Sequence, residues 1–154
     1  MSNIRAIDLF CGTGGLSLGL QQAGIEVVAG IDLEHRCKYP YEHNLNAQFI
    51  EASVVDVTAE MLNELWGQGA LRLLAGCAPC QPFSSQRRGK DPSQHKNWRL
   101  LDEFGRLVRE TSPDYVTMEN VPLLARDAMF KRFVQTLETE GYSVDYGILY
   151  GPDF

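Results

Sequence analysis

The chain has 154 residues, of which 44% are hydrophobic and 22% are charged, proportions typical of one globular domain with one core. No apolar run approaches the roughly 20 residues that a membrane-spanning helix needs, and residues 1–5 lack signal-peptide features, so we expect a cytoplasmic protein without a membrane partner. The net charge of −6 argues against a stand-alone nucleic-acid-binding protein, because neutralising phosphates usually requires a basic surface.

Short apolar runs alternate with amphipathic stretches along the whole chain. Strands are predicted at residues 4–10, 26–31, 48–55, 71–75 and 114–118, and a sixth begins at 142–149. Helices are predicted at residues 16–23, 33–46 (with Pro40 in its middle), 58–66, 100–108 and 129–137. This alternation predicts an α/β fold with a doubly wound, mostly parallel sheet that binds ligands at the carboxyl ends of its strands.

A glycine-rich turn, residues 12–15, follows the first predicted strand and would let backbone N–H groups approach a ligand. Ser17 stands where a dinucleotide-binding fingerprint has Gly or Ala. Asp32 ends the second strand and could accept both hydroxyls of a ribose, although a capping or surface acid is an equally open interpretation. Asp56 could accept from an adenine amino group, or simply precede the helix that Thr58 caps. Together the turn and Asp32 indicate an adenosine-type cofactor.

The most reactive candidate is Cys80, one of four cysteines that we expect to be thiols in a cytosolic chain. Pro79 and Pro82 stiffen the backbone around it, just beyond the fourth strand. A thiol with a pKa of about 8.5 needs nearby cations to become a nucleophilic thiolate. The polar segment at residues 81–97 is long enough to be functional, and five basic residues face one acid between residues 87 and 99, which suits a phosphate-facing loop.

The pair Cys77-x-x-Cys80 has the spacing of half a zinc site. No second pair of this kind exists, and the three histidines show no paired spacing, so we expect no metal.

Glu119 and Asn120 end the fifth predicted strand. If the fourth and fifth strands are neighbours, Cys80 and Glu119 open onto one crevice. A thiolate and a carboxylic acid in one pocket suit covalent addition to an electrophilic ring with delivery of a proton. The alternative is that Glu119 is an acid at a helix start beside Pro122.

Three segments, residues 8–15, 79–84 and 119–121, occur in the order and spacing of the cytosine-5 DNA methyltransferases, and the chain resembles this family from residue 4 to about 154. The resemblance implies a Rossmann-like fold and S-adenosyl-L-methionine as methyl donor. It places Phe10 on the cofactor, the glycine turn around the methionine moiety, Asp32 on the ribose and Asp56 on the adenine amino group. The residues that it assigns to the cofactor are Phe10, Gly12, Gly14, Gly15, Leu16, Asp32, Leu33, Asp56, Val57 and Pro79.

The resemblance also implies a mechanism on duplex DNA. The target cytosine is flipped out of the stack, and Cys80 then adds to its C6. Glu119 contacts N3 and the exocyclic amine, C5 takes the methyl group, and loss of the C5 proton expels Cys80. Asn120 orients the Cys80 loop, and the basic loop closes over the DNA. The residues assigned to DNA contact are Ser84, Ser85, Gln86, Arg87, Arg88 and Lys90.

Family members continue beyond the position of Phe154 with a glutamine-arginine motif, a seventh strand and a target-recognition domain. We therefore expect residues 1–154 to be the N-terminal part of the catalytic domain, incomplete at the C-terminus and lacking the target-recognition domain. The sixth strand would then have no neighbour, and either a second polypeptide completes the domain or the chain is truncated.

Three other functions stay open at this point. A tRNA cytosine-5 methyltransferase would share the same segments, and an inert fragment would need a second chain. A nicotinamide-dependent oxidoreductase fits the glycine turn and Asp32, but Ser17 and the Cys80/Glu119 pair count against it.

Overall fold

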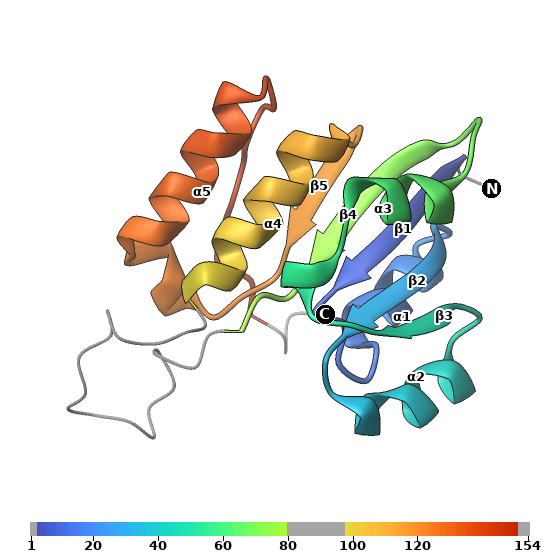
Figure 1. The fold of residues 1–154 in the computed structure, drawn as a ribbon. Helices are drawn as coiled ribbons and strands as arrows, with labels where there is room; N and C mark the ends of the chain where they lie inside the picture. Colours follow the sequence, from blue (N-terminus) through green and yellow to red (C-terminus); the bar gives the residue numbers. More distant parts are fainter. Residues whose placement is uncertain (1–2, 80–97, 151–154) are drawn as a thin grey trace.

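The computed structural model describes residues 3–79 and 98–150, with the side chain of Trp98 left aside. Its centre is one parallel sheet of five strands in the order β3-β2-β1-β4-β5 (Figure 1). The strands are β1 (Ile4–Leu9), β2 (Glu26–Asp32), β3 (Gln48–Glu51), β4 (Leu71–Gly76) and β5 (Tyr115–Met118). The predicted doubly wound α/β fold is confirmed, and so is the expectation that the fourth and fifth strands are neighbours.

Five α-helices within residues 3–79 and 98–150 connect and cover the strands: α1 (Gly15–Gln22), α2 (Lys38–Asn44), α3 (Ala59–Trp66), α4 (Trp98–Thr111) and α5 (Ala128–Thr139). Figure 1 shows α3 and α4 on the near face of the sheet and α1 on the far face. The side chains of β1 point alternately to the two faces of the sheet, in agreement with this arrangement. Ile7 and Leu9 join the core under α3, α4 and α5, whereas Ala6 joins the cluster that includes Leu20 of α1.

Two of the predicted helices form for the reasons that their patterns indicated. The Thr58 hydroxyl accepts a hydrogen bond from the Met61 amide at 3.3 Å and caps α3, as predicted. In α4 the predicted apolar stripe is buried at Leu101, Phe104 and Leu107.

Two predicted elements are shorter than their apolar patterns suggested. The third strand ends at Glu51, because the Ser53 side chain accepts from the Val55 amide and opens a short 3₁₀ helix, Val54–Asp56. The helix predicted at residues 33–46 is a 3₁₀ turn, His35–Cys37, followed by α2. Pro40 lies in the first turn of α2, where its missing N–H has no intrahelical partner to lose.

The sixth strand is a wrong prediction within the described residues. Residues 142–150 contain no strand; Tyr142 and Val144 pack against the core, and the Tyr146 ring packs edge-on against Phe130. The Tyr142 hydroxyl is anchored on the Pro113 carbonyl instead. In the described part of the chain β5 pairs only with β4, and residues 142–150 add no strand to its other edge.

No helix in the described residues is both long and apolar enough to cross a membrane.

Candidate active site

The glycine turn lies at the carboxyl end of β1 and bends the chain sharply into α1. Phe10, Gly12 and Gly14 have positive φ angles of 57°, 51° and 97°. A Cβ on Gly14 would lie 2.3 Å from Leu45 Cδ1, so both the backbone conformation and the packing require glycine there. The backbone of Phe10 has a positive φ angle, which residues with bulky side chains rarely adopt. Such a conformation is typical of a backbone shaped for function.

Asp32 links this turn to the end of β2. Its Oδ2 accepts from the Gly12 amide and its Oδ1 from the Glu34 amide, both at 2.9 Å. Each carboxylate oxygen keeps a second lone pair, so the same side chain could still accept from a ribose hydroxyl. Leu33, directly after Asp32, is 70% exposed at this edge.

The segment that carries Asp56 and Val57 lies beside the end of β2. The Ala52 amide donates to the Asp32 carbonyl at 3.1 Å, which brings the chain back from β3. Val54 and Val57 are buried in the core, whereas Val55 and Asp56 are exposed. The predicted adenine contact therefore lies at the same sheet edge as the predicted ribose contact.

The β4 and β5 ends lie together at the other side of the glycine turn. The Cys77 amide donates to the Leu9 carbonyl, and the Glu119 amide donates to the Gly76 carbonyl, both at 3.2 Å. Asn120 Nδ2 donates to the Ala78 carbonyl at 2.7 Å, two residues before Cys80. Glu119 is exposed at this edge.

Cys80 and the predicted DNA-contacting residues lie outside the described residues. Those DNA-contacting residues are Ser84, Ser85, Gln86, Arg87, Arg88 and Lys90.

The other three cysteines are poor nucleophiles at neutral pH. Burial raises the pKa of the Cys77 thiol to about 12, and the charges of Asp8 and Glu119 add to this effect. Burial, assisted by Asp8 and Asp32, raises the pKa of Cys11 far above its usual value, and burial also raises that of Cys37. The raised pKa values keep these three thiols mostly in the protonated form at neutral pH.

Sequence reasoning missed a buried polar network beneath the glycine turn. Ser17 Oγ donates to Asp8 Oδ2 at 2.7 Å and lies 2.8 Å from Tyr41 Oη. Asp8 is fully buried, and its Oδ1 has no hydrogen-bond partner in the described chain. Burial raises the pKa of Asp8 to about 6, with Ser17 opposing the shift and Asp32 adding to it. In the sequence Ser17 stood out only because it breaks the dinucleotide-binding fingerprint, and no local signal pointed to Tyr41.

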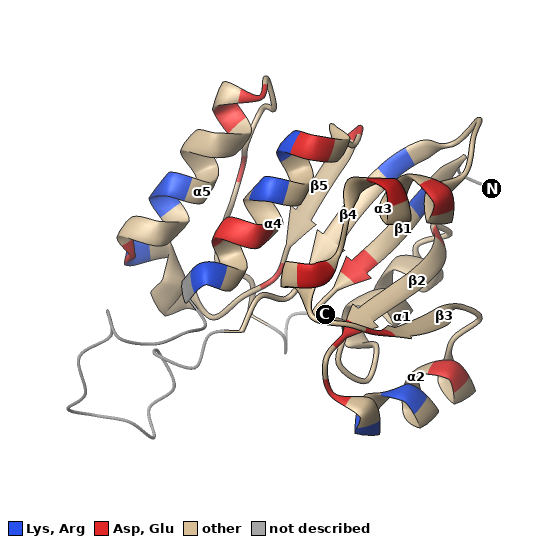
Figure 2. Ribbon diagram, viewed as in Figure 1, with Lys and Arg blue, Asp and Glu red and all other residues tan. Residues whose placement is uncertain are grey.

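Acidic residues gather where β1 and β2 end (Figure 2). In the described parts of the chain, no three His, Cys, Asp or Glu side chains cluster closely enough to hold a metal ion. This edge of the sheet thus offers carboxylate oxygens to a ligand.

Comparison with known proteins identifies the arrangement. The family described as "C-5 cytosine-specific DNA methylase" matches residues 4–154. The Type II methylase M.HgiDII of Herpetosiphon aurantiacus is 45% identical over 151 residues, which are 96% of this chain and 42% of that protein. The Type II methyltransferase M.XorII of Xanthomonas oryzae is 35% identical over 168 residues, covering 100% of this chain and 38% of its own length. The chain thus spans about two-fifths of these relatives.

A solved structure agrees on the fold. Entamoeba histolytica methyltransferase EhMeth superposes with a TM-score of 0.77 at 18% identity, over 99% of this chain and 49% of that one. With the family match over nearly every residue, the conclusion follows that this chain belongs to the C-5 cytosine-specific DNA methylase family.

Proposed function

We propose that this chain supplies the cofactor-binding and catalytic residues for methyl transfer to C5 of a cytosine in DNA. The observation that carries the proposal is the meeting of Glu119 with the segment leading to Cys80 at the ends of β4 and β5, beside the glycine turn of β1. The methyltransferase would act in the bacterial cytoplasm, as part of a restriction-modification system like its Type II relatives.

S-adenosyl-L-methionine would supply the methyl group from its sulfonium. The residues present fit this cofactor, because the glycine turn bends the backbone sharply at the carboxyl end of β1 while Asp32 and Asp56 offer acceptors along one edge. Carboxylates at this edge suit a cationic sulfonium and ribose hydroxyls. Phe10, Leu16, Leu33, Val57 and Pro79 would complete the site.

Cys80 would form a bond from its sulfur to C6 of the flipped cytosine, which moves electron density towards C5. Glu119 would hold N3 and the exocyclic amine and support protonation of N3. After methylation, loss of the C5 proton restores the ring double bond as the thiolate leaves. The bond from Asn120 to the Ala78 carbonyl supports its role in orienting the Cys80 segment. The raised pKa of Cys77 supports Cys80 as the nucleophile of this pair.

The test is covalent trapping. In the presence of S-adenosyl-L-methionine, we expect a duplex containing 5-fluorocytosine to form an adduct, stable to denaturing electrophoresis, with this chain joined to the C-terminal part of its Herpetosiphon relative. After methyl transfer to C5 the fluorine cannot leave as a proton does, so Cys80 is not expelled. Cys80→Ala should abolish the adduct and Cys37→Ala should retain it. An adduct that survives Cys80→Ala, or one that forms only on tRNA, would contradict the proposal.

A further inference from the structure

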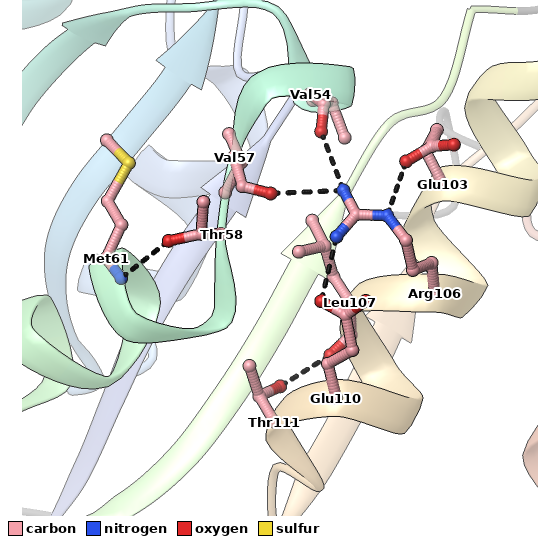
Figure 3. A network of polar contacts seen from close by, with 9 residues as sticks. All are labelled: Val54, Val57, Thr58, Met61, Glu103, Arg106, Leu107, Glu110 and Thr111. Atoms are coloured by element: carbon pink, nitrogen blue, oxygen red, sulfur yellow. Dashed lines mark hydrogen bonds and ion pairs between the residues drawn. The ribbon is translucent and has the colours of Figure 1, made fainter.

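Arg106 of α4 reaches out of its own helix to the 3₁₀ segment that carries Asp56 (Figure 3). Its Nη2 donates to the carbonyls of Val54 at 3.3 Å and Val57 at 3.0 Å. Two acids of α4 hold the guanidinium in place, with Glu103 at 2.6 Å from Nε and Glu110 at 2.8 Å from Nη1. The planar fork of arginine allows all four contacts at once, which a lysine could not make.

The two carbonyls that Arg106 binds bracket the exposed pair of residues between them. Val54 and Val57 are only 3% and 1% exposed, so their side chains are fixed in the core while their carbonyls are fixed by Arg106. Val55 and Asp56 are left to face solvent. The backbone on both sides of Asp56 is therefore held in place. Its carbonyls are bound by Arg106 of α4, and the flanking valine side chains are packed in the core.

The charge of Arg106 is secured at every accessible pH. Partial burial lowers the pKa of its guanidinium, but the hydrogen bonds and charges of Glu103 and Glu110 raise it by more, so the net shift is upward. Charged donors make stronger hydrogen bonds to carbonyl oxygens than neutral ones. The clamp on the Val54 and Val57 carbonyls thus persists whenever the fold does.

We propose that Arg106 is a positioning residue for cofactor recognition: by clamping the Val54 and Val57 carbonyls it holds Asp56 where that carboxylate accepts from the adenine amino group. The inference rests on the proposed function, which assigns Asp56 to the adenine. It adds that selectivity for an adenine over other bases depends on α4, the helix that follows the Cys80 loop in the chain.

The test compares two ligands that differ only at the base, S-adenosyl-L-homocysteine and S-inosyl-L-homocysteine, by calorimetry on the full chain. The inosyl compound presents a carbonyl oxygen where the adenosyl compound presents an amino group. We expect the wild type to prefer the adenosyl compound by about tenfold, the value of one hydrogen bond to a charged group. In Arg106→Gln this preference should fall to about twofold, because Asp56 is no longer held.

A matched control is Arg109→Gln, which removes another arginine from α4, one for which no hydrogen bond to residues 54–57 is found in the described chain. It should keep the wild-type preference. The preference of Arg106→Lys should lie between those of the wild type and Arg106→Gln, since lysine keeps the charge but lacks the planar fork of donors. If Arg106 had only a structural role, Arg106→Gln would weaken the binding of both ligands equally and leave the preference unchanged. That result would overturn the inference.

Asp56→Ala separates this inference from the proposed function. If Asp56→Ala loses the preference but Arg106→Gln keeps it, the assignment of Asp56 stands and the role of Arg106 falls. If Asp56→Ala keeps the preference, or if the wild type binds neither ligand, the assignment of Asp56 falls and the inference falls with it.

Discussion

At the scale of single residues, Asp8 is the most unusual group in the structure. It is a fully buried acid at the end of β1, directly before the glycine turn, and one of its oxygens lacks a partner in the described chain. Burying an incompletely satisfied carboxylate costs free energy, which is why its pKa rises to about 6. A residue that lowers stability at neutral pH in this way is typical of a site shaped for function rather than for folding.

The raised pKa predicts a specific pH dependence of stability. Because the folded protein binds this proton more tightly than the unfolded chain, the stabilisation from Asp8 is present below about pH 4 and is lost as the pH rises through about 6. Across that window the wild type should lose about 3 kcal/mol relative to Asp8→Asn, which does not titrate.

Urea unfolding of both proteins between pH 4 and pH 7.5 measures this difference, and other carboxylates cancel in the comparison. A difference that stays constant across the window would show that Asp8 titrates normally.

At the scale of elements, β2 and α2 fit together because β2 has a glycine at the contact. A Cβ on Gly30 would lie 2.4 Å from the Tyr41 ring and 2.7 Å from Cys11 Sγ. Tyr41 is fully buried and near Ser17, so it cannot swing aside cheaply. The close approach of α2 to the sheet thus depends on a missing side chain.

Gly30→Ala should therefore lower the free energy of unfolding by about 1–3 kcal/mol, the usual cost of overpacking a core. Gly19→Ala is the matched control, since a Cβ there meets nothing within 4 Å. On the exposed face of α1 it should be neutral or stabilise by about 0.5–1 kcal/mol. Chemical denaturation compares the two variants, and equal effects would contradict the packing account.

At the scale of the whole molecule, one edge of the sheet ends at β5, and an apolar segment follows α5. Within the described residues β5 pairs only with β4, and Tyr146, Ile148 and Leu149 are 63%, 75% and 78% exposed. Open strand edges and exposed apolar side chains promote association between molecules.

We expect the isolated chain to self-associate through this region at high concentration. Replacing both Ile148 and Leu149 with Ser should reduce the association, measured by sedimentation velocity, whereas Tyr39→Ser on α2 should not, although Tyr39 is 74% exposed. Equal association of all three proteins would place the contact elsewhere.

Local patterns were sufficient for most elements. The period of buried residues predicted α4, and Thr58 predicted the start of α3, because both signals lie within one or two helical turns. The third strand was predicted too long, since the Ser53 side chain competes with the strand for the Val55 amide. The sixth strand was wrong because a strand needs a hydrogen-bonding neighbour, which is a property of the sheet and not of the segment.

Patterning and motifs of adjacent residues were enough to predict the fold class, the glycine turn, and the positions of Asp32, Glu119 and Asn120 at the ends of strands, with Asp56 in the segment after the third strand. Which groups contact one another follows from the packing of the elements in three dimensions. Residues far apart in the chain make the buried network in which Ser17 contacts both Asp8 and Tyr41, and the clamp of Arg106 on the segment that carries Asp56. Such contacts depend on which helices and strands pack against one another, and no pattern within a single segment specifies its partner.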